Sequence, residues 1–481
     1  MNLLINEKGN FLIFNATALA LFLYFIAIIG TMFLSAKQLP LIIIGFPALI
    51  FFVYLLVNQT HYLLLFYVML IPLLQHFNFI GFGIGDFFIT IHMAFQFVIL
   101  LGVAYHYINN HSGKDGALST LEKTFGIFFI LTFFSLIFPF YLPMQHTKRF
   151  LLFYNGIIEP IMFYFMLTFY LRRKNTFERK LFWAIILSSF ATLIVSYFEL
   201  APTGMSIVKI YLSRVQIGFG YHNTNLFGIH FSLLFPILFY FVIDKDFTRH
   251  RYIVIASFVI LTVLSILTFN RGTFIVLGLQ IFLLLFMIKE GRKVILFMLF
   301  ALLIITIYYN EIIFFYIFRF IGGESSGGSK GILDASVYYR MAAWEVGLKM
   351  LFLFPLGLGA GGFQYAWEKY GVDPTFYLGT PHQLFLSIGV DYGLLVLITF
   401  IVILTIVFVD LSQLIKKPLY NSTNFYKCMV ISFIGFIVYG MLTDGELSHL
   451  TGFTLPNNGY TLILFSLFAI ISYNKEKLNE R

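Results

Sequence analysis

The sequence predicts an all-α integral membrane protein with about 12–14 transmembrane helices and one large extracytoplasmic loop. Its 481 residues are 60% hydrophobic and only 11% charged, and the mean hydropathy is +0.89. A soluble globular domain has about 25% charged residues. Apolar runs that approach the ~20 residues of a spanning helix recur along the whole chain. The bilayer is therefore the expected solvent for most of the protein.

Fourteen apolar runs fit spanning or nearly spanning helices, and Tyr62–Leu74 is the shortest of them. The first half of the chain contains Phe11–Phe33, Leu39–Val57, Tyr62–Leu74, Phe87–Tyr107, Phe125–Tyr141, Phe150–Leu171 and Leu181–Leu200. The second half contains Leu226–Ile243, Tyr252–Phe269, Thr273–Ile288, Val294–Tyr309, Gln383–Phe408, Tyr426–Thr443 and Gly459–Tyr473.

The distribution of positive charge predicts the orientation of these helices, because short cytoplasmic loops are enriched in Lys and Arg. Placing both termini inside puts 20 of the 31 Lys and Arg residues on the cytoplasmic side and 11 outside. The basic clusters LRRKNTFERK, DKDFTRHR and KEGRK then all lie inside. Topology thus accounts for the net charge of +9, and no nucleic-acid partner is expected.

The single cysteine, Cys428, excludes an internal disulfide and a cysteine-based metal site. Its place beside Lys427 at a predicted helix end is typical of a packing residue. The first apolar run has full length and lacks a small-residue cleavage site, so we expect it to be retained as a helix. We find no internal repeat.

One long polar segment, residues 310–381, is predicted to be the extracytoplasmic loop. It follows an N-terminal group of helices (1–149) and a central group (150–309), and it precedes the C-terminal helices (382–481). The loop contains the Gly/Ser-rich stretch GGESSGGSKG.

Within this loop, Val337–Phe354 is expected to form a helix. The helix is apolar but interrupted by charged residues, which favours a position at the membrane interface. Pro355 should end it, and the glycines that follow should form a turn. The turn matches the pattern GxGxxG at Gly357, Gly359 and Gly362. A dinucleotide site needs this pattern directly after a strand, so we expect close backbone packing or approach to a ligand phosphate instead.

Three arginines lie on the predicted outer side beside apolar segments: Arg214, Arg271 and Arg340. A guanidinium group binds phosphate oxygens bidentately and keeps its charge in a low-dielectric setting. Three of them could hold a pyrophosphate at the membrane surface. The alternative is snorkelling or pairing with carboxylates. Arg271 fits that alternative least, because it lies in a turn of a few residues between two apolar helices.

His382 follows Pro381 and precedes a predicted helix that begins near Gln383. The positive end of a helix dipole disfavours the imidazolium form. A neutral imidazole can accept a proton, as a general base must. The same helix end could instead bind an anion, and a lone histidine is also compatible with a packing role.

Two carboxylates, Glu159 and Asp391, lie inside predicted spans. Ionisable groups in a bilayer are candidates for function, although protonated or hydrogen-bonded structural roles fit both. The sequence shows no cluster with metal-ligand spacing, no Walker-type loop and no DxD-like acidic pair. An activated lipid donor is therefore easier to accommodate than a soluble nucleotide sugar, and no cofactor is expected.

The order of five motifs between Phe150 and Phe408 resembles the O-antigen ligase and polymerase family of bacterial membrane glycosyltransferases. These motifs are GIIEPIMFY, GYHNTNLFG preceded by Arg214, FNRGT, YYRMAAW with PLGLGAGGF, and HQLFLSIGVDYG. The family transfers glycans from undecaprenyl pyrophosphate on the outer face of the inner membrane.

The family's histidine motif is His, then Asn, Ser or Gln, then nine residues, then Gly, and His382, Gln383 and Gly393 match it. Val396 stands where the ligase branch has a small or aromatic residue, and Thr224–Asn225 replaces the family's Pro-Asn. By resemblance, Arg214, Arg271 and Arg340 bind the donor pyrophosphate, with Asn225 and Gln383 as further substrate-binding residues. The resemblance also implies metal-independent inverting transfer. His382 would activate or orient the acceptor hydroxyl, and Arg271 would be the second catalytic residue.

We therefore expect a polysaccharide polymerase in the bacterial cytoplasmic membrane, with its active site facing outward and a lipid-linked oligosaccharide as substrate. A flippase and a chain-length regulator are possible partners. The first alternative is an O-antigen ligase or O-oligosaccharyltransferase of the same family. An alternative of another class is a lipid-linked oligosaccharide flippase. Transporters concentrate polar residues in broken helices at the midplane, whereas this chain has them at the outer boundary.

Overall fold

The structure of the protein is a computed structural model. It describes residues 55–56, 59–76, 81–84, 87–109, 118–137, 146–174, 176–213, 217–221, 224–244, 250–308, 335–371, 379–419, 423–442, 449–451, 455–457 and 459–480. The chain divides into two compact units, one of Met1–Met69 with Met93–Gly116 and one of Leu70–His92 with Ala117–Arg481.

The helices α3 (Thr60–His76) and α4 (Ile91–Asn109) each contribute most of their length to the first unit, and there they approach each other closely. A Cβ on Gly102 would lie 2.8 Å from the side chain of Thr60, so a larger residue there would require the Thr60 side chain to move. Tyr67 and Phe95 add a ring contact with a centroid distance of 5.8 Å.

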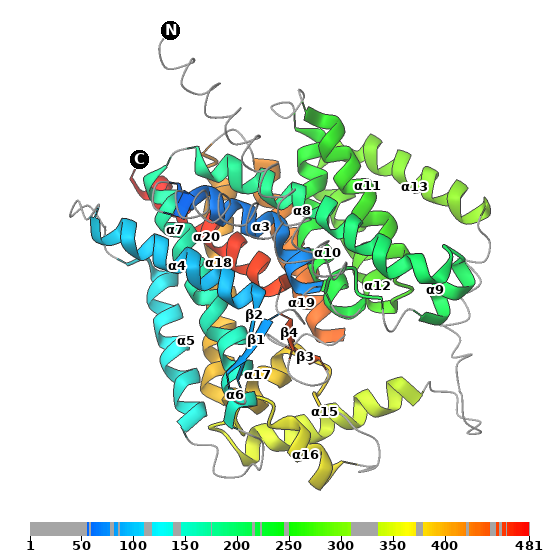
Figure 1. Ribbon diagram of the computed structural model, residues 1–481. Helices are drawn as coiled ribbons and strands as arrows, with labels where there is room; N and C mark the ends of the chain where they lie inside the picture. The colour runs from blue at the N-terminus through cyan, green and yellow to red at the C-terminus, as the bar shows by residue number, and fades with distance from the viewer. Residues whose placement is uncertain are drawn as a thin grey trace, which may run out of the picture. The chain divides into compact units, whose positions relative to one another are not determined.

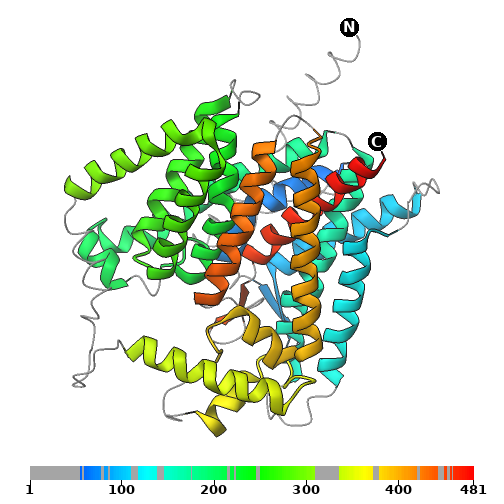
Figure 2. The same ribbon diagram turned by 180° about the vertical axis from the view of Figure 1, so that it is seen from behind.

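The second unit is built almost wholly of helices (Figures 1 and 2). They are α5 (Thr120–Ile137), α6 (His146–Phe153), α7 (Glu159–Arg173), α8 (Phe177–Leu200), α9 (Ile207–Ser213), α10 (Thr224–Ile243), α11 (Arg251–Leu267), α12 (Arg271–Met287), α13 (Arg292–Tyr308), α15 (Ala335–Leu353), α16 (Phe363–Tyr370), α17 (Leu384–Tyr392), α18 (Leu394–Lys416), α19 (Thr423–Leu442) and α20 (Gly459–Asn479). Two short antiparallel ribbons join β1 (Gly81–Ile84) to β2 (Phe87–Thr90) and β3 (His449–Thr451) to β4 (Leu455–Asn457).

The helix α10 lies at the centre of this unit and is buried on nearly all sides. Its main partner is α19, which also packs on α12 and α18. Small residues allow these close contacts, as in other membrane bundles. Gly435 of α19 lies against the side chain of Gln280, whose Nε2 donates to the carbonyl of Ser232 at 2.6 Å.

Within the described residues, five helical segments are long and apolar enough to cross a membrane: Phe150–Arg173, Phe177–Thr203, Thr224–Ile243, Leu394–Lys416 and Thr423–Leu442. A further pair, Arg271–Met287 and Lys289–Phe300, meets that test jointly but is bent by 112°. Three shorter apolar helices, Thr60–His76, His92–Ile108 and Arg251–Leu267, accompany them. The predicted class, an all-α polytopic membrane protein, is confirmed.

Most predicted spans correspond to observed helices, with two corrections. Phe87–Thr90 was expected to begin a helix but forms strand β2. Gln383–Phe408 was expected to be one helix, but the backbone breaks at Gly393, between α17 and α18. The predicted runs Phe11–Phe33 and most of Leu39–Val57 lie outside the described residues. The short helices α9 and α16 had not been predicted.

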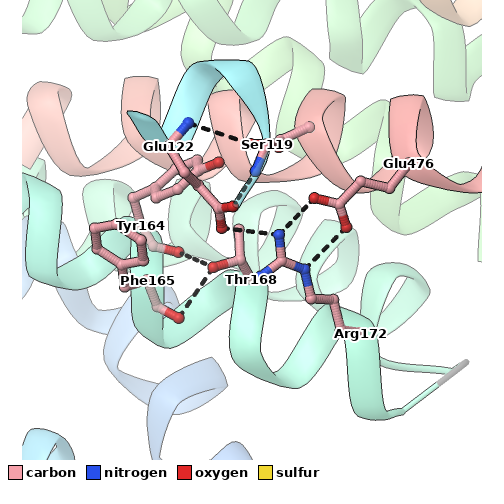
Figure 3. A network of polar contacts seen from close by, with 8 residues as sticks. Ser119, Glu122, Tyr164, Phe165, Thr168, Arg172 and Glu476 are labelled. Carbon is pink, nitrogen blue, oxygen red and sulfur yellow. Dashed lines mark hydrogen bonds and ion pairs between the residues drawn. The ribbon is translucent and has the colours of Figure 1, made fainter. Parts of the chain in front are cut away.

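A network of polar contacts joins helix ends in the second unit. Arg172 of α7 lies between Glu122 of α5 and Glu476 of α20 (Figure 3). Its Nε donates to Glu476 Oε2 at 2.9 Å, and its Nη2 lies 2.8 Å from Glu122 Oε1. Glu122 also accepts a hydrogen bond from Ser119 N and donates its own N–H to Ser119 Oγ, which is a capping box. The network thus fixes the start of α5 against two neighbouring helices.

Candidate functional site

Segments that carry several of the predicted site residues meet at the C-terminal end of α19. Tyr439 OH lies 3.2 Å from Thr273 Oγ1, in the first turn of α12. One residue on, a Cβ at Gly440 would lie 3.1 Å from Cβ of Leu384, the first residue of α17. The carbonyl of Leu442 accepts a hydrogen bond from Arg340 Nη1 at 3.1 Å. Three segments far apart in sequence therefore meet at one helix end.

The start of α12 is built around Asn270. This residue is the N-cap, and its Oδ1 accepts hydrogen bonds from Gly272 N at 2.8 Å and Thr273 N at 3.3 Å. Its Nδ2 donates to Oδ1 of Asn225, in the first turn of α10. Arg271 is thus the first residue of α12, where the helix dipole disfavours a cation. Helix stability does not explain an arginine at this position.

The histidine motif has a clear structural basis. Gln383 is the N-cap of α17, and its side-chain oxygen accepts from Leu386 N at 2.5 Å. The nine residues that follow form the helix, and Gly393 ends it with φ of +100°. The spacing of His, Gln, nine residues and Gly therefore encodes one short helix with both of its caps.

His382 itself lies one residue before that N-cap, with a left-handed φ of +51°. Such backbone strain is uncommon in residues other than glycine and concentrates at functional sites. Thr380 Oγ1 accepts a hydrogen bond from His382 N at 3.0 Å, which helps to hold this conformation. The expectation that His382 stands beside the start of a helix is confirmed.

The glycine-rich turn after α15 packs against the break between α17 and α18. Pro355 O accepts from Leu394 N at 2.8 Å, and Val390 O and Asp391 O accept from Leu358 N and Gly359 N at the same distance. The turn follows a helix and contacts backbone, so it has the close packing expected of it, and the dinucleotide pattern is incidental.

Asp391 accepts two hydrogen bonds from this turn. Its carbonyl accepts from Gly359 N, and its Oδ2 accepts from Gly361 N at 3.1 Å. The residue therefore fastens the turn to the helix that carries His382 at its other end. A Cβ on Gly357 would lie 2.6 Å from Asp391 O, so the approach requires glycine.

Arg340 is carried by α15, which has a hydrophobic core shared with α16 and α17. Ala343, Val346 and Met350 of α15 pack in this cluster with the fully buried Trp367. Gly347 lies beside Pro381 and Leu386. Arg340 and His382 are therefore held by elements that pack directly on each other.

Glu159, the first residue of α7, lies in the second unit. It is fully buried, and its Oε1 lies 2.5 Å from His92 Nε2. His92 Nε2 is in turn 3.3 Å from Gln75 Nε2. The π-helical turn Tyr154–Ile158 directly precedes Glu159, and such turns are frequent at functional positions.

Arg214 lies outside the described residues. The turn 217–221, which follows it, reveals a residue that the sequence did not indicate. The carboxylate of Glu199 accepts hydrogen bonds from the N–H groups of Gly218, Phe219 and Gly220 at 2.9, 2.7 and 3.1 Å. His76 Nδ1 lies 3.2 Å from the same carboxylate. A glutamate at a helix end could have been noted, but its partners are backbone groups with no sequence signature.

No group of three or more His, Cys, Asp or Glu residues with metal-binding geometry occurs within the described part of the chain. The side chains and helix ends at this site are cationic or polar. Arg340 donates to the end of α19, and the N-termini of α10, α12 and α17 approach this end, with Arg271 as the first residue of α12. Each helix N-terminus carries about half a positive charge. The arrangement favours an anionic ligand.

The fold and this site define a polytopic membrane protein with an arginine- and histidine-bearing site at its helix ends. Residues 256–401 match the family described as O-antigen ligase. This segment extends from α11 into α18 and includes Arg271, Arg340, His382 and Asp391. The match confirms the resemblance to the O-antigen ligase and polymerase family, whose members are glycosyltransferase-like enzymes. No curated protein matches the chain.

Proposed function

We propose that this protein is a polysaccharide polymerase that transfers a glycan from undecaprenyl pyrophosphate to a sugar hydroxyl on the outer face of the cytoplasmic membrane. The observation that supports it best is the convergence of three helix N-termini with Arg271 and Arg340 at one end of α19. A pyrophosphate is the kind of ligand that such a cationic site binds.

In the proposed reaction, the oxygen of the acceptor hydroxyl attacks the anomeric carbon of the donor glycan. The bond from that carbon to the phosphate oxygen breaks, and undecaprenyl pyrophosphate leaves with the bonding electrons. His382 takes the proton of the hydroxyl as general base. Because the attack comes from the side opposite the leaving group, the anomeric configuration inverts.

Arg214, Arg271 and Arg340 would hold the pyrophosphate and stabilise the charge that develops on it. A leaving group held in this way needs no general acid, no metal and no nucleotide. Asn225 supports Arg271 through its hydrogen bond to Asn270, and Gln383 supports His382 as the adjoining helix cap. Asp391 acts through the glycine turn, and Glu159 is auxiliary.

Ligation of the glycan to a lipid or protein acceptor is the second candidate. The family description, O-antigen ligase, favours it. Val396, which departs from the ligase pattern and is buried in α18, favours the polymerase. Both reactions use the same donor and the same chemistry, so they differ only in the acceptor.

Reconstitution distinguishes these functions. Purified protein in proteoliposomes would receive one lipid-linked repeat unit as both donor and acceptor. A polymerase yields a ladder of longer lipid-linked glycans. A product only on addition of a separate lipid or protein acceptor indicates a ligase. Movement of the lipid-linked glycan between leaflets without any new glycosidic bond would contradict both and indicate a transporter.

A further inference from the structure

The helix α15 has an apolar face that the rest of the described chain leaves exposed. Tyr338, Met341, Leu348 and Phe352 recur on one side of the helix, and Leu356 continues the row in the turn that follows. These five residues are called the α15 stripe below. Phe352 is 75% exposed and Leu356 is 66% exposed. Glu345 is also exposed and lies on this side of the helix between Met341 and Leu348, so the row is mainly apolar with one charged residue within it. An exposed row that is mainly apolar marks an interaction surface.

The stripe is distinct from the face of α15 that packs against α16 and α17. Ala343, Val346 and Met350 turn toward α16 and α17 and are buried with Trp367. The helix therefore already has its hydrophobic core. A second apolar face on the same helix is not needed for that packing and requires another environment.

The stripe continues into the apolar outer surface of α18. The hydrogen bond from Leu394 N to Pro355 O, 2.8 Å long, places Leu356 beside the start of α18. There Leu395 is 54% exposed, and Ile398 and Ile401 extend the exposed surface along the helix. The segment Leu394–Lys416 is strongly apolar, and only 33% of its most apolar stretch is buried. Lipid is the environment that such a surface requires.

The orientation of α15 agrees with this continuity. The helix lies across the end at which α17 and α18 meet, whereas α18 runs along the bundle (Figures 1 and 2). Lys349 borders the stripe, and its Nζ lies 5.0 Å from the ring centroid of Tyr370. Lysine and tyrosine at the edge of an apolar helix face are typical of the membrane interface.

We propose that α15 is an interfacial helix whose stripe contacts the acyl chains of the leaflet next to the α17–α18 junction. The carbonyl of Leu442, which accepts from Arg340, lies on another side of α15. The lipid contact would thus fix Arg340 at the depth of the lipid headgroups. The inference requires only that the protein spans a membrane, and it stands or falls independently of the glycosyl transfer.

The test is site-directed spin labelling in proteoliposomes of phosphatidylethanolamine and phosphatidylglycerol. Single cysteines replace Met341, Leu348 or Phe352 in a Cys428→Ser background, and collision with oxygen is compared with collision with a water-soluble nickel chelate. Ile398 on α18 is the lipid reference, and the exposed Glu368 on α16 is the water reference.

The proposal predicts that all three stripe positions show an oxygen-to-nickel ratio several-fold above that of Glu368 and close to that of Ile398. Water-like ratios at these positions would overturn it. Protection from both reagents would also overturn it, because the stripe would then be covered by protein. Labelled variants must retain the elution volume and thermal transition of the Cys428→Ser parent. We expect this because the three replaced side chains are exposed.

Discussion

Replacing Gly393 by alanine tests whether the break between α17 and α18 holds the site together. A Cβ at this position would lie 2.6 Å from the carbonyl carbon of Leu356 and 2.7 Å from Pro355 O. Both are backbone atoms of the glycine turn, so no side chain can rotate away. The φ of +100° and ψ of 166° also belong to a region that is essentially reserved for glycine.

The expected cost is the sum of two effects. Backbone strain of this kind costs about 1–3 kcal/mol, and overpacking costs about 1–3 kcal/mol. Gly393→Ala should therefore destabilise the protein by about 2–6 kcal/mol unless the turn shifts. A shift of the turn would displace α17 and with it His382, so turnover should fall even in the folded fraction.

Gly278→Ala is the matched control, because this glycine is in α12 and a Cβ there would meet nothing within 4 Å. The control should be neutral or stabilised by up to about 1 kcal/mol, the usual gain from alanine inside a helix. Thermal unfolding in detergent and glycan synthesis in proteoliposomes are the assays. A Gly393→Ala protein as stable and as active as the Gly278→Ala protein would refute the reasoning.

Three further predictions follow from the same structure. Arg271→Lys should weaken binding of the lipid-linked donor, because a point charge cannot reproduce the bidentate fork; unchanged donor KM in a folded variant would exclude this role. Glu199→Ala should cost about 1.5–3 kcal/mol of stability, since three N–H groups of the turn 217–221 lose a charged acceptor. It should also raise the donor KM, because this turn follows Arg214, which we propose binds the donor. Glu199→Gln, which keeps one acceptor oxygen, should recover part of both losses, and equal defects in the two variants would contradict the proposed hydrogen bonding. Transfer should survive excess EDTA without added nucleotide, and a strict need for a divalent ion or ATP would rule out the metal-independent mechanism.

The parts of the fold that could be predicted from the sequence are those that depend on local chemistry. Apolar run length located most helices, Pro355 marked the end of α15, and the glycines after it marked a turn. The histidine motif also placed His382 correctly beside a helix start. These signals act over a few residues, so one sequence is sufficient to read them.

The parts that could not be predicted depend on contacts between distant segments. An apolar run does not show that Gly393 interrupts it, because the break is stabilised by the turn 355–362 rather than by its own neighbours. Glu159 was visible as a buried charge, but its partner His92 lies 67 positions earlier, in another helix. The meeting of Thr273, Leu384 and Leu442 at one end of α19 is likewise a property of the packing.

The most direct test of the proposed mechanism is the turnover of His382→Ala, measured with donor binding on the same purified protein. General base catalysis acts in the transition state, so turnover should fall by about 10²-fold or more while donor affinity is largely retained. The variant must keep the thermal transition of the parent protein, because His382 adjoins the N-cap of α17. Near-normal glycan synthesis by the folded His382→Ala protein would contradict the assignment of His382 as the base.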